Sequence, residues 1–135
     1  MPTFFGVRGV LPVTLFAPRR SGVALYVTSD GGRSWRIRSV RLVGFRTLLR
    51  SNPFPRYVPT AVASRSTWWV VSRIAVPRVL VTSDAGRHWR GSRPSLAGAS
   101  FARIDAFGPS AWLTLGPQLL ATGDGGRSWR RLRVP

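Results

Sequence analysis

One eight-residue phrase occurs three times in this chain, and it constrains the fold more than any other feature of the sequence. Its copies read TSDGGRSW at residues 28–35, TSDAGRHW at residues 82–89 and TGDGGRSW at residues 122–129. Each copy keeps Thr, Asp, Gly, Arg and Trp at fixed offsets and follows an apolar run. Internal repeats at a spacing of ~20–50 residues are typical of modular arrays. The chain is therefore expected to contain three similar units.

The repeated Asp is expected to have a local role in each turn. The chain has only 4 acidic residues, and all but Asp105 are the Asp of the phrase. An Asp side chain in a turn accepts hydrogen bonds from backbone N–H groups one or two residues further on. The following Gly residues supply a positive φ at little steric cost. Because Ala85 stands at the first Gly position of the second copy, we expect that only the second position needs a positive φ.

Short apolar segments separated by Gly, Pro, Ser and Asp surround each phrase, and no stretch has helical periodicity. The predicted strands lie at residues 10–16, 23–28 and 34–40, at 60–63, 67–72, 78–82 and from 89, and at 101–107, 111–115, 118–122 and 129–134. This spacing favours an antiparallel all-β fold. The sequence predicts one domain, residues 1–135, with units at roughly 1–42, 60–93 and 94–135 and an inserted Pro- and Arg-rich loop at 43–59. The apolar alternation after the Trp differs by one place between the first and third units, so no common strand register is predicted.

Arginine dominates the charge of the chain. The formal net charge is +17, with 21 basic residues, no Glu and no Cys. This balance is typical of a protein with an anionic partner, such as nucleic acid or an acidic surface. The codon usage of a high-GC genome is the alternative explanation of the Arg-for-Lys bias. The absence of Cys excludes disulfides and thiolate metal sites.

Two Arg residues flank the Trp of every copy, and they form a candidate basic rim. The rim comprises Arg33, Arg36, Arg87, Arg90, Arg127 and Arg130. Charged residues on an edge strand discourage strand-to-strand aggregation. The functional alternative is a surface that docks an acidic partner. Interleaved Trp and Arg also suit single-stranded nucleic acid, but the three Trp residues of the phrase are expected to pack, which weakens that alternative.

The phrase resembles the Asp-box, or BNR repeat, whose pattern is Ser/Thr-x-Asp-x-Gly-x-x-Trp. The matching positions are Thr28, Asp30, Gly32 and Trp35, then Thr82, Asp84, Gly86 and Trp89, then Thr122, Asp124, Gly126 and Trp129. The spelling is most similar to the photosystem II assembly/stability factor group and to sialidase-like repeat proteins. The resemblance implies β-propeller blades in which the box lies on the turn between the third and fourth strands. It also implies that the box fastens the outer part of the blade, away from the central site. A divalent-cation site would need several converging oxygens, and each turn offers a single carboxylate.

Three units are fewer than a closed propeller contains, since propellers usually have ~4–8 blades. Residues 2–5 resemble the first strand of a blade. The expected fold is therefore an incomplete β-propeller, either a piece of a longer propeller or a chain that self-associates to complete one. A β-trefoil is the alternative, because three units of this length also fit that fold.

The sequence carries no recognisable catalytic set. A sialidase-like enzyme pairs a Tyr nucleophile with a Glu, and this chain has no Glu and only two Tyr residues, Tyr26 and Tyr57. Asp105 is expected to pair with a nearby Arg such as Arg103. His88, which occupies a position held by Ser in the other copies, is expected to be a solvated substitution. No nucleophile–base pair, phosphate-binding loop or metal cluster stands out, so we expect no catalysis and no cofactor.

The resulting hypothesis is a non-catalytic binding or assembly module with a basic rim for an acidic protein or a carbohydrate. The alternatives are a truncated part of a sialidase-like glycoside hydrolase and a polyanion or nucleic-acid binder. No run approaches the ~18 apolar residues of a membrane helix. Residues 9–17 are apolar but lack a small-residue cleavage site, so a strand is expected there instead of a signal peptide. Proteins that the chain resembles are often extracytoplasmic, but the sequence itself assigns no compartment.

Overall fold

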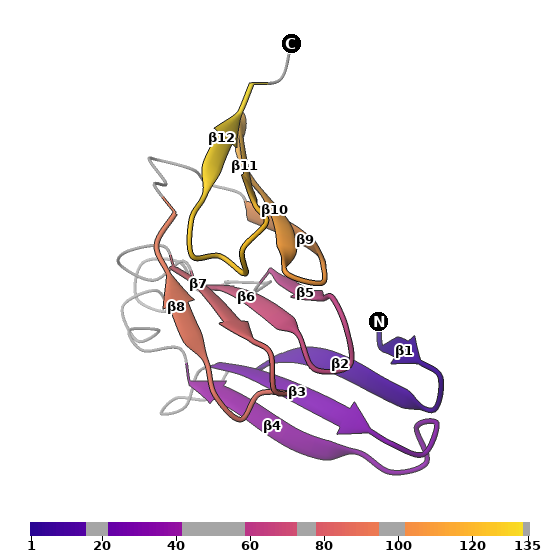
Figure 1. Cartoon of the computed structure of the whole chain (residues 1–135). Coiled ribbons are helices and arrows are strands. Elements are labelled where there is room, and N and C mark those ends of the chain that lie inside the picture. Colours follow the sequence, from indigo (N-terminus) through magenta and orange to yellow (C-terminus); the bar gives the residue numbers. More distant parts are fainter. Residues whose placement is uncertain (16–21, 42–58, 73–77, 95–101, 134–135) are drawn as a thin grey trace. The chain divides into compact units, whose positions relative to one another are not determined.

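The computed structural model describes residues 1–15, 22–41, 59–72, 78–94 and 102–133. These residues form three four-stranded antiparallel sheets (Figure 1). The first sheet contains β1 (Thr3–Phe5), β2 (Arg8–Leu15), β3 (Gly22–Thr28) and β4 (Arg36–Arg41). The second contains β5 (Thr60–Val62), β6 (Trp68–Ser72), β7 (Arg78–Thr82) and β8 (Arg90–Ser92). The third contains β9 (Ala102–Phe107), β10 (Ser110–Leu115), β11 (Gln118–Thr122) and β12 (Arg130–Leu132).

Each sheet is built from four consecutive strands in simple up-and-down order. This is the construction of a propeller blade. In the described part of the chain no strand is shared between sheets, as the barrel of a β-trefoil would require. The all-β prediction and the three blade-like units are confirmed, and the molecule is a partial β-propeller. The described residues include no helix that is long and apolar enough to cross a membrane.

The chain divides into two compact units, Met1–Val58 and Pro59–Pro135. The first unit contains the sheet β1–β4, and the second contains the sheets β5–β8 and β9–β12. Most of the inserted loop predicted at residues 43–59 lies outside the described residues. Its last residue, Pro59, is buried, and its carbonyl accepts a hydrogen bond from the backbone N–H of Val71 at 2.9 Å. Pro59 is therefore tied to the second sheet.

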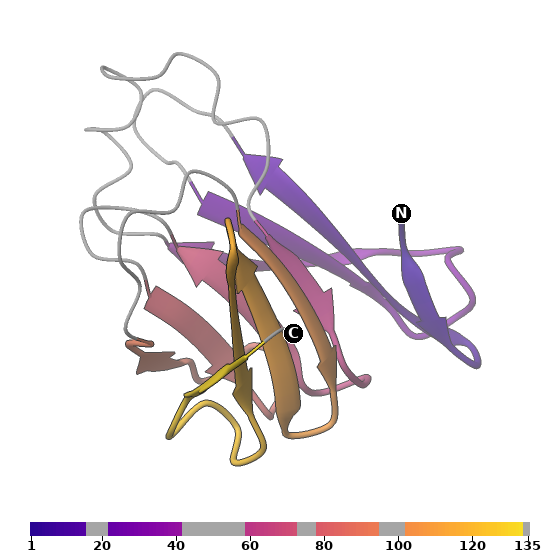
Figure 2. The ribbon, with the colours of Figure 1, turned by 90° about the horizontal axis from the view of Figure 1, so that it is seen from above.

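The core of the second unit lies between its two sheets. Strand β9 runs beside β5 in both views (Figures 1 and 2). The buried residues of this core are Ala61, Trp69, Val71, Val79 and Val81 from the second sheet and Ile104, Ala111, Leu113, Leu115 and Leu120 from the third. Because successive side chains in a strand point to opposite faces, β10 buries Leu113 in this core and leaves Trp112 on the other face.

All three sheets share one register at the repeated phrase. The residue after the repeat Trp pairs with the residue before the repeat Thr, as Val27↔Arg36, Val81↔Arg90 and Ala121↔Arg130. The shifted apolar alternation after the Trp therefore does not change the pairing. Turn geometry fixes the register of a hairpin, and the turn has the same length in every unit. Strands β4, β8 and β12 consequently start at equivalent points.

Candidate functional site

The Thr and Asp of each phrase hold its turn closed. The Thr28 hydroxyl donates to Oδ1 of Asp30 at 2.7 Å, and the backbone N–H of Gly32 donates to Thr28 Oγ1 at 3.0 Å. The same two bonds occur at 2.8 and 3.0 Å in both the second and the third copies. The Thr is buried in all three units. These bonds satisfy turn groups that would otherwise lack partners.

The second oxygen of each carboxylate is bound by the residue four places further on. In the first copy, Ser34 donates its backbone N–H to Asp30 Oδ1 at 2.9 Å and its hydroxyl to Oδ2 at 2.6 Å. Ser128 repeats this arrangement in the third copy. In the second copy, Nδ1 of His88 lies 2.6 Å from Asp84 Oδ2 and donates there in its Nδ1-protonated form. The His88 side chain is exposed, as expected, but it also takes over the role of the Ser.

These hydrogen bonds lower the pKa of all three Asp residues well below the usual range of a carboxyl. For Asp30 and Asp124 the largest cause is the Ser hydroxyl, followed by the Ser backbone N–H. For Asp84 it is the backbone N–H of His88, followed by the His88 side chain. Hydrogen bonds to an ionised carboxylate favour that form. A group held ionised in this way serves as an acceptor within its turn and is a poor proton donor. The described residues also contain no group of three or more metal-ligating side chains.

The first Gly position of the phrase adopts a positive φ in every copy, contrary to the sequence-based expectation. The φ values are 71° at Gly31, 59° at Ala85 and 73° at Gly125. The backbone N–H at this position donates to a carbonyl in the turn between the first two strands of the same sheet, at 2.7, 2.9 and 2.9 Å, respectively. The acceptors are Val7, Ser66 and Pro109. Ala85 therefore adopts the left-handed conformation in which its backbone N–H makes this hydrogen bond.

The Trp residues of the phrase differ in their contacts. Trp35 donates its indole N–H to the carbonyl of Gly32 at 3.0 Å and contacts Phe4 edge-on. Trp129 donates its indole N–H to Ser92 Oγ at 2.7 Å and contacts Trp69 edge-on, with ring centroids 6.3 Å apart. Both partners of Trp129 belong to the second sheet, so this Trp joins two sheets of one unit. Trp89 is half-buried and lines a pocket.

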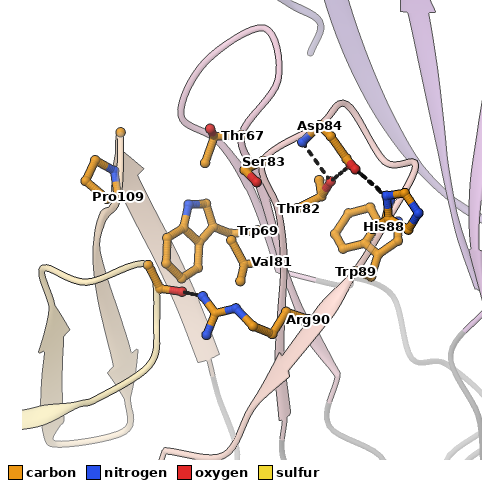
Figure 3. Close-up of a pocket in the computed structure, with 12 residues that line it drawn as sticks. Thr67, Trp69, Val81, Thr82, Ser83, Asp84, His88, Trp89, Arg90 and Pro109 are labelled. Carbon is orange, nitrogen blue, oxygen red and sulfur yellow. Dashed lines mark hydrogen bonds and ion pairs between the residues drawn. The ribbon is translucent and has the colours of Figure 1, made fainter.

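This pocket, of about 450 Å³, lies within the second unit, between the repeat turn of the second sheet and two turns of the third (Figure 3). Its wall includes Trp69, Val81, Trp89, Arg90, His88 and Pro109. Figure 3 shows the Trp69 ring beside Val81, with Pro109 opposite and Arg90 beneath. The indole nitrogen of Trp69 is buried and has no hydrogen-bond partner in the described part of the protein. The pocket thus combines an apolar wall with polar groups at its edge.

The structure places all six Arg residues of the candidate rim at exposed positions. One Arg of each pair lies in the repeat turn and the other begins the fourth strand of the sheet. Arg90 differs from its counterparts because its guanidinium also donates to the carbonyl of Gly125 in the third sheet. Arg103 forms the one Arg–Asp ion pair in the described ranges, with Nε 2.9 Å from Asp105 Oδ2.

Comparison with known proteins identifies the fold. No protein-family model and no curated protein matches the chain. A solved structure described as YCF48 bound to D1 peptide matches with a TM-score of 0.55 and 19% identity, over 91% of this chain and 42% of that chain. YCF48 from Cyanidioschyzon merolae matches with a TM-score of 0.53 and 18% identity, over 85% of this chain and 33% of that chain.

The chain therefore spans less than half the length of these two structures. Their similarity supports the β-propeller architecture that the three sheets already define. At this level of identity the likeness concerns the fold alone.

Proposed function

We propose that this chain is a non-catalytic β-propeller module that binds an acidic segment of a partner protein. In this proposal the repeated phrases are Asp-box turns that fasten the blades, and the rim Arg residues carry the binding. The proposal rests on one observation: the rim Arg side chains are exposed, while nearly all the acidic groups of the chain are engaged in turns.

The distribution of hydrogen bonds leaves the rim without internal counter-charges. Each repeat Asp accepts bonds from its own Thr and from the Ser or His four places further on. The fourth acid, Asp105, pairs with Arg103. Among the described residues, no carboxylate lies within salt-bridge distance of a rim Arg. Arg binds carboxylates in a bidentate geometry that adds specificity to the charge attraction.

The pocket beside the second repeat favours a peptide over a featureless polyanion. Arg90 lines the pocket together with Trp69 and Trp89, and Arg87 lies in the adjoining turn. An apolar side chain of the partner would pack against the half-buried ring of Trp89, while its neighbouring carboxylates reach the guanidinium groups. The solved YCF48 structure with its D1 peptide supports a protein segment as the class of partner.

The test measures binding of a fluorescein-labelled peptide in which Glu and Leu alternate, by anisotropy, at about 200 mM salt, where surface charge is strongly screened. We expect saturable binding that is lost when Gln replaces every Glu. Arg87→Gln should weaken binding about fivefold, the upper value for one solvent-exposed ion pair. Arg78→Gln is the matched control, because Arg78 is exposed but begins β7 at the end away from the repeat turn. It should leave the affinity nearly unchanged.

Two results would count against this function. Equal losses in the Arg87 and Arg78 variants would show that net charge alone attracts the peptide. Tighter binding of a single-stranded oligonucleotide than of the peptide at the same salt concentration would favour the nucleic-acid alternative.

A further inference from the structure

The second and third sheets carry a Trp at the same place, but in different surroundings. Trp69 pairs with Val81, the residue before the repeat Thr, and Trp112 pairs with the corresponding Ala121. The two side chains therefore project from equivalent points on equivalent faces. Trp69 is 0% exposed, whereas Trp112 is 42% exposed.

The third sheet is what covers Trp69. Trp129 contacts the Trp69 ring edge-on, and a Cβ added to Gly126 would lie 3.1 Å from Trp69 Cζ3. Leu113 and Leu120 of the third sheet join the same core. The face of the second sheet that carries Trp69 is thus buried by the face of the third sheet that carries Leu113 and Leu120.

Trp112 belongs to an apolar surface that we call the end face, formed by Phe107, Trp112, Leu119 and Leu132. The strand register places these four side chains on one side of the third sheet. Phe107 is 79% exposed, and Leu119 and Leu132 are partly exposed. The same side of the sheet also carries the Arg103–Asp105 ion pair and Arg130. Exposed apolar side chains gathered on one face are typical of an interaction surface.

The first sheet carries the complementary type of surface, which we call the start face, formed by Phe4, Leu11, Tyr26 and Ile37. Leu11 pairs with Tyr26 as Leu113 pairs with Leu120. The start face therefore corresponds to the face with which the third sheet covers Trp69. Phe4 is 46% exposed and Ile37 is 58% exposed.

We propose that the end face of one copy of this chain binds the start face of a second copy. The contact would repeat the packing seen between the second and third sheets, with Trp112 in the place of Trp69. Such an interface is heterologous, because two different surfaces meet. This self-association goes beyond the proposed peptide binding, and it would also bring the rim residue Arg130, which pairs with Ala121 on the end face, against the second copy.

Salt should strengthen this association. Each copy has a net charge of +17, so two copies repel each other at low ionic strength. Screening removes that repulsion while the apolar contact persists. Binding of an acidic partner to the rim would weaken as the salt concentration rises. Self-association and partner binding can therefore be distinguished by their opposite salt dependence.

The experiment is sedimentation of the full chain at about 50 mM and about 500 mM salt, a range over which screening changes strongly. We expect dimers or larger species, increasing with salt. Trp112→Arg and Ile37→Arg should each give monomers at both salt concentrations. Val7→Arg is the control, because Val7 is 64% exposed in the turn between β1 and β2 and lies on neither face. It adds the same charge and should still associate. Circular dichroism would verify that each variant is folded.

A mixture of the two monomeric variants provides the decisive result. The Trp112→Arg copy keeps an intact start face, and the Ile37→Arg copy keeps an intact end face. Mixed together, they should form a one-to-one dimer. A mixture that stays monomeric would overturn the heterologous pairing. A wild-type chain that is monomeric at both salt concentrations would overturn self-association altogether.

Discussion

At the scale of single residues, the three turns show how different side chains perform the same function. Ser34 and His88 both donate to the second carboxylate oxygen at 2.6 Å. The scarcity of acids in the sequence indicates the role of the Asp residues, because nearly all of them occur in the phrase. The donor four places on is harder to predict, since Ser and His share little beyond a suitably placed N–H or O–H.

Ala85 shows where sequence reasoning fails at this scale. Replacement of Gly by Ala indicates a position without a positive φ, yet Ala85 has a φ of 59°. The constraint comes from a hydrogen bond to the backbone carbonyl of Ser66. Backbone acceptors leave no trace in side-chain identity, and the three acceptors are indeed Val, Ser and Pro. The strain at Ala85 therefore becomes visible only in the structure.

We predict that Ala85→Gly stabilises the protein. The left-handed conformation costs an L-residue about 1–2 kcal/mol, and the extra freedom of Gly in the unfolded chain offsets part of this gain. The expected increase in the free energy of unfolding is about 0.5–1 kcal/mol, measured by urea denaturation. Gly31→Ala is the matched reverse change, because an added Cβ would meet nothing within 4 Å there. It should destabilise by a similar amount, and equal effects of the same sign would contradict this explanation.

At the scale of strands and sheets, the apolar pattern predicts most elements well. The predicted segment 118–122 is strand β11, and 78–82 is strand β7. The register after the Trp could not be predicted from the apolar pattern, because that pattern shifts between units while the turn keeps the pairing constant. The contact between Trp129 and Ser92 joins residues 37 positions apart, so no local signal reveals it.

This contact gives a prediction about how two sheets are held together. The indole N–H of Trp129 donates to the buried hydroxyl of Ser92 at 2.7 Å. Trp129→Phe and Ser92→Ala should each lower the free energy of unfolding. A double-mutant cycle should give a coupling energy of about 0.5–1.5 kcal/mol, the usual net value of one hydrogen bond. Purely additive losses would mean that the indole contributes by packing alone.

At the scale of the whole molecule, the repeated phrase predicts the propeller architecture, and the shared topology of the three sheets agrees with it. The pocket could not be predicted, because its wall combines residues from Thr67 to Gly125 that are brought together by sheet packing. The exposure of Trp112 could not be predicted either, because Trp68-Trp69 and Trp112 occupy similar positions in the predicted strands. Burial depends on whether another sheet lies opposite, which is a property of the assembly and not of the local sequence.

We propose that the repeat Asp residues fasten the fold while the Arg residues beside them bind the partner. Asp84 and Arg87 lie in the same turn, so substitutions at these two neighbouring positions test the two roles separately. Asp84→Asn removes a carboxylate that accepts four hydrogen bonds from Thr82, Arg87 and His88. It should lower the unfolding midpoint. Because it also removes a negative charge, it should not weaken binding of an acidic peptide.

The most direct measurement is therefore the affinity of the Glu–Leu peptide for Asp84→Asn and Arg87→Gln, side by side, at a temperature at which both variants are folded. We predict that Asp84→Asn binds as tightly as the unchanged chain or slightly more tightly, while Arg87→Gln binds about fivefold more weakly. A folded Asp84→Asn that loses as much affinity as Arg87→Gln would contradict it, because the Asp would then take part in binding.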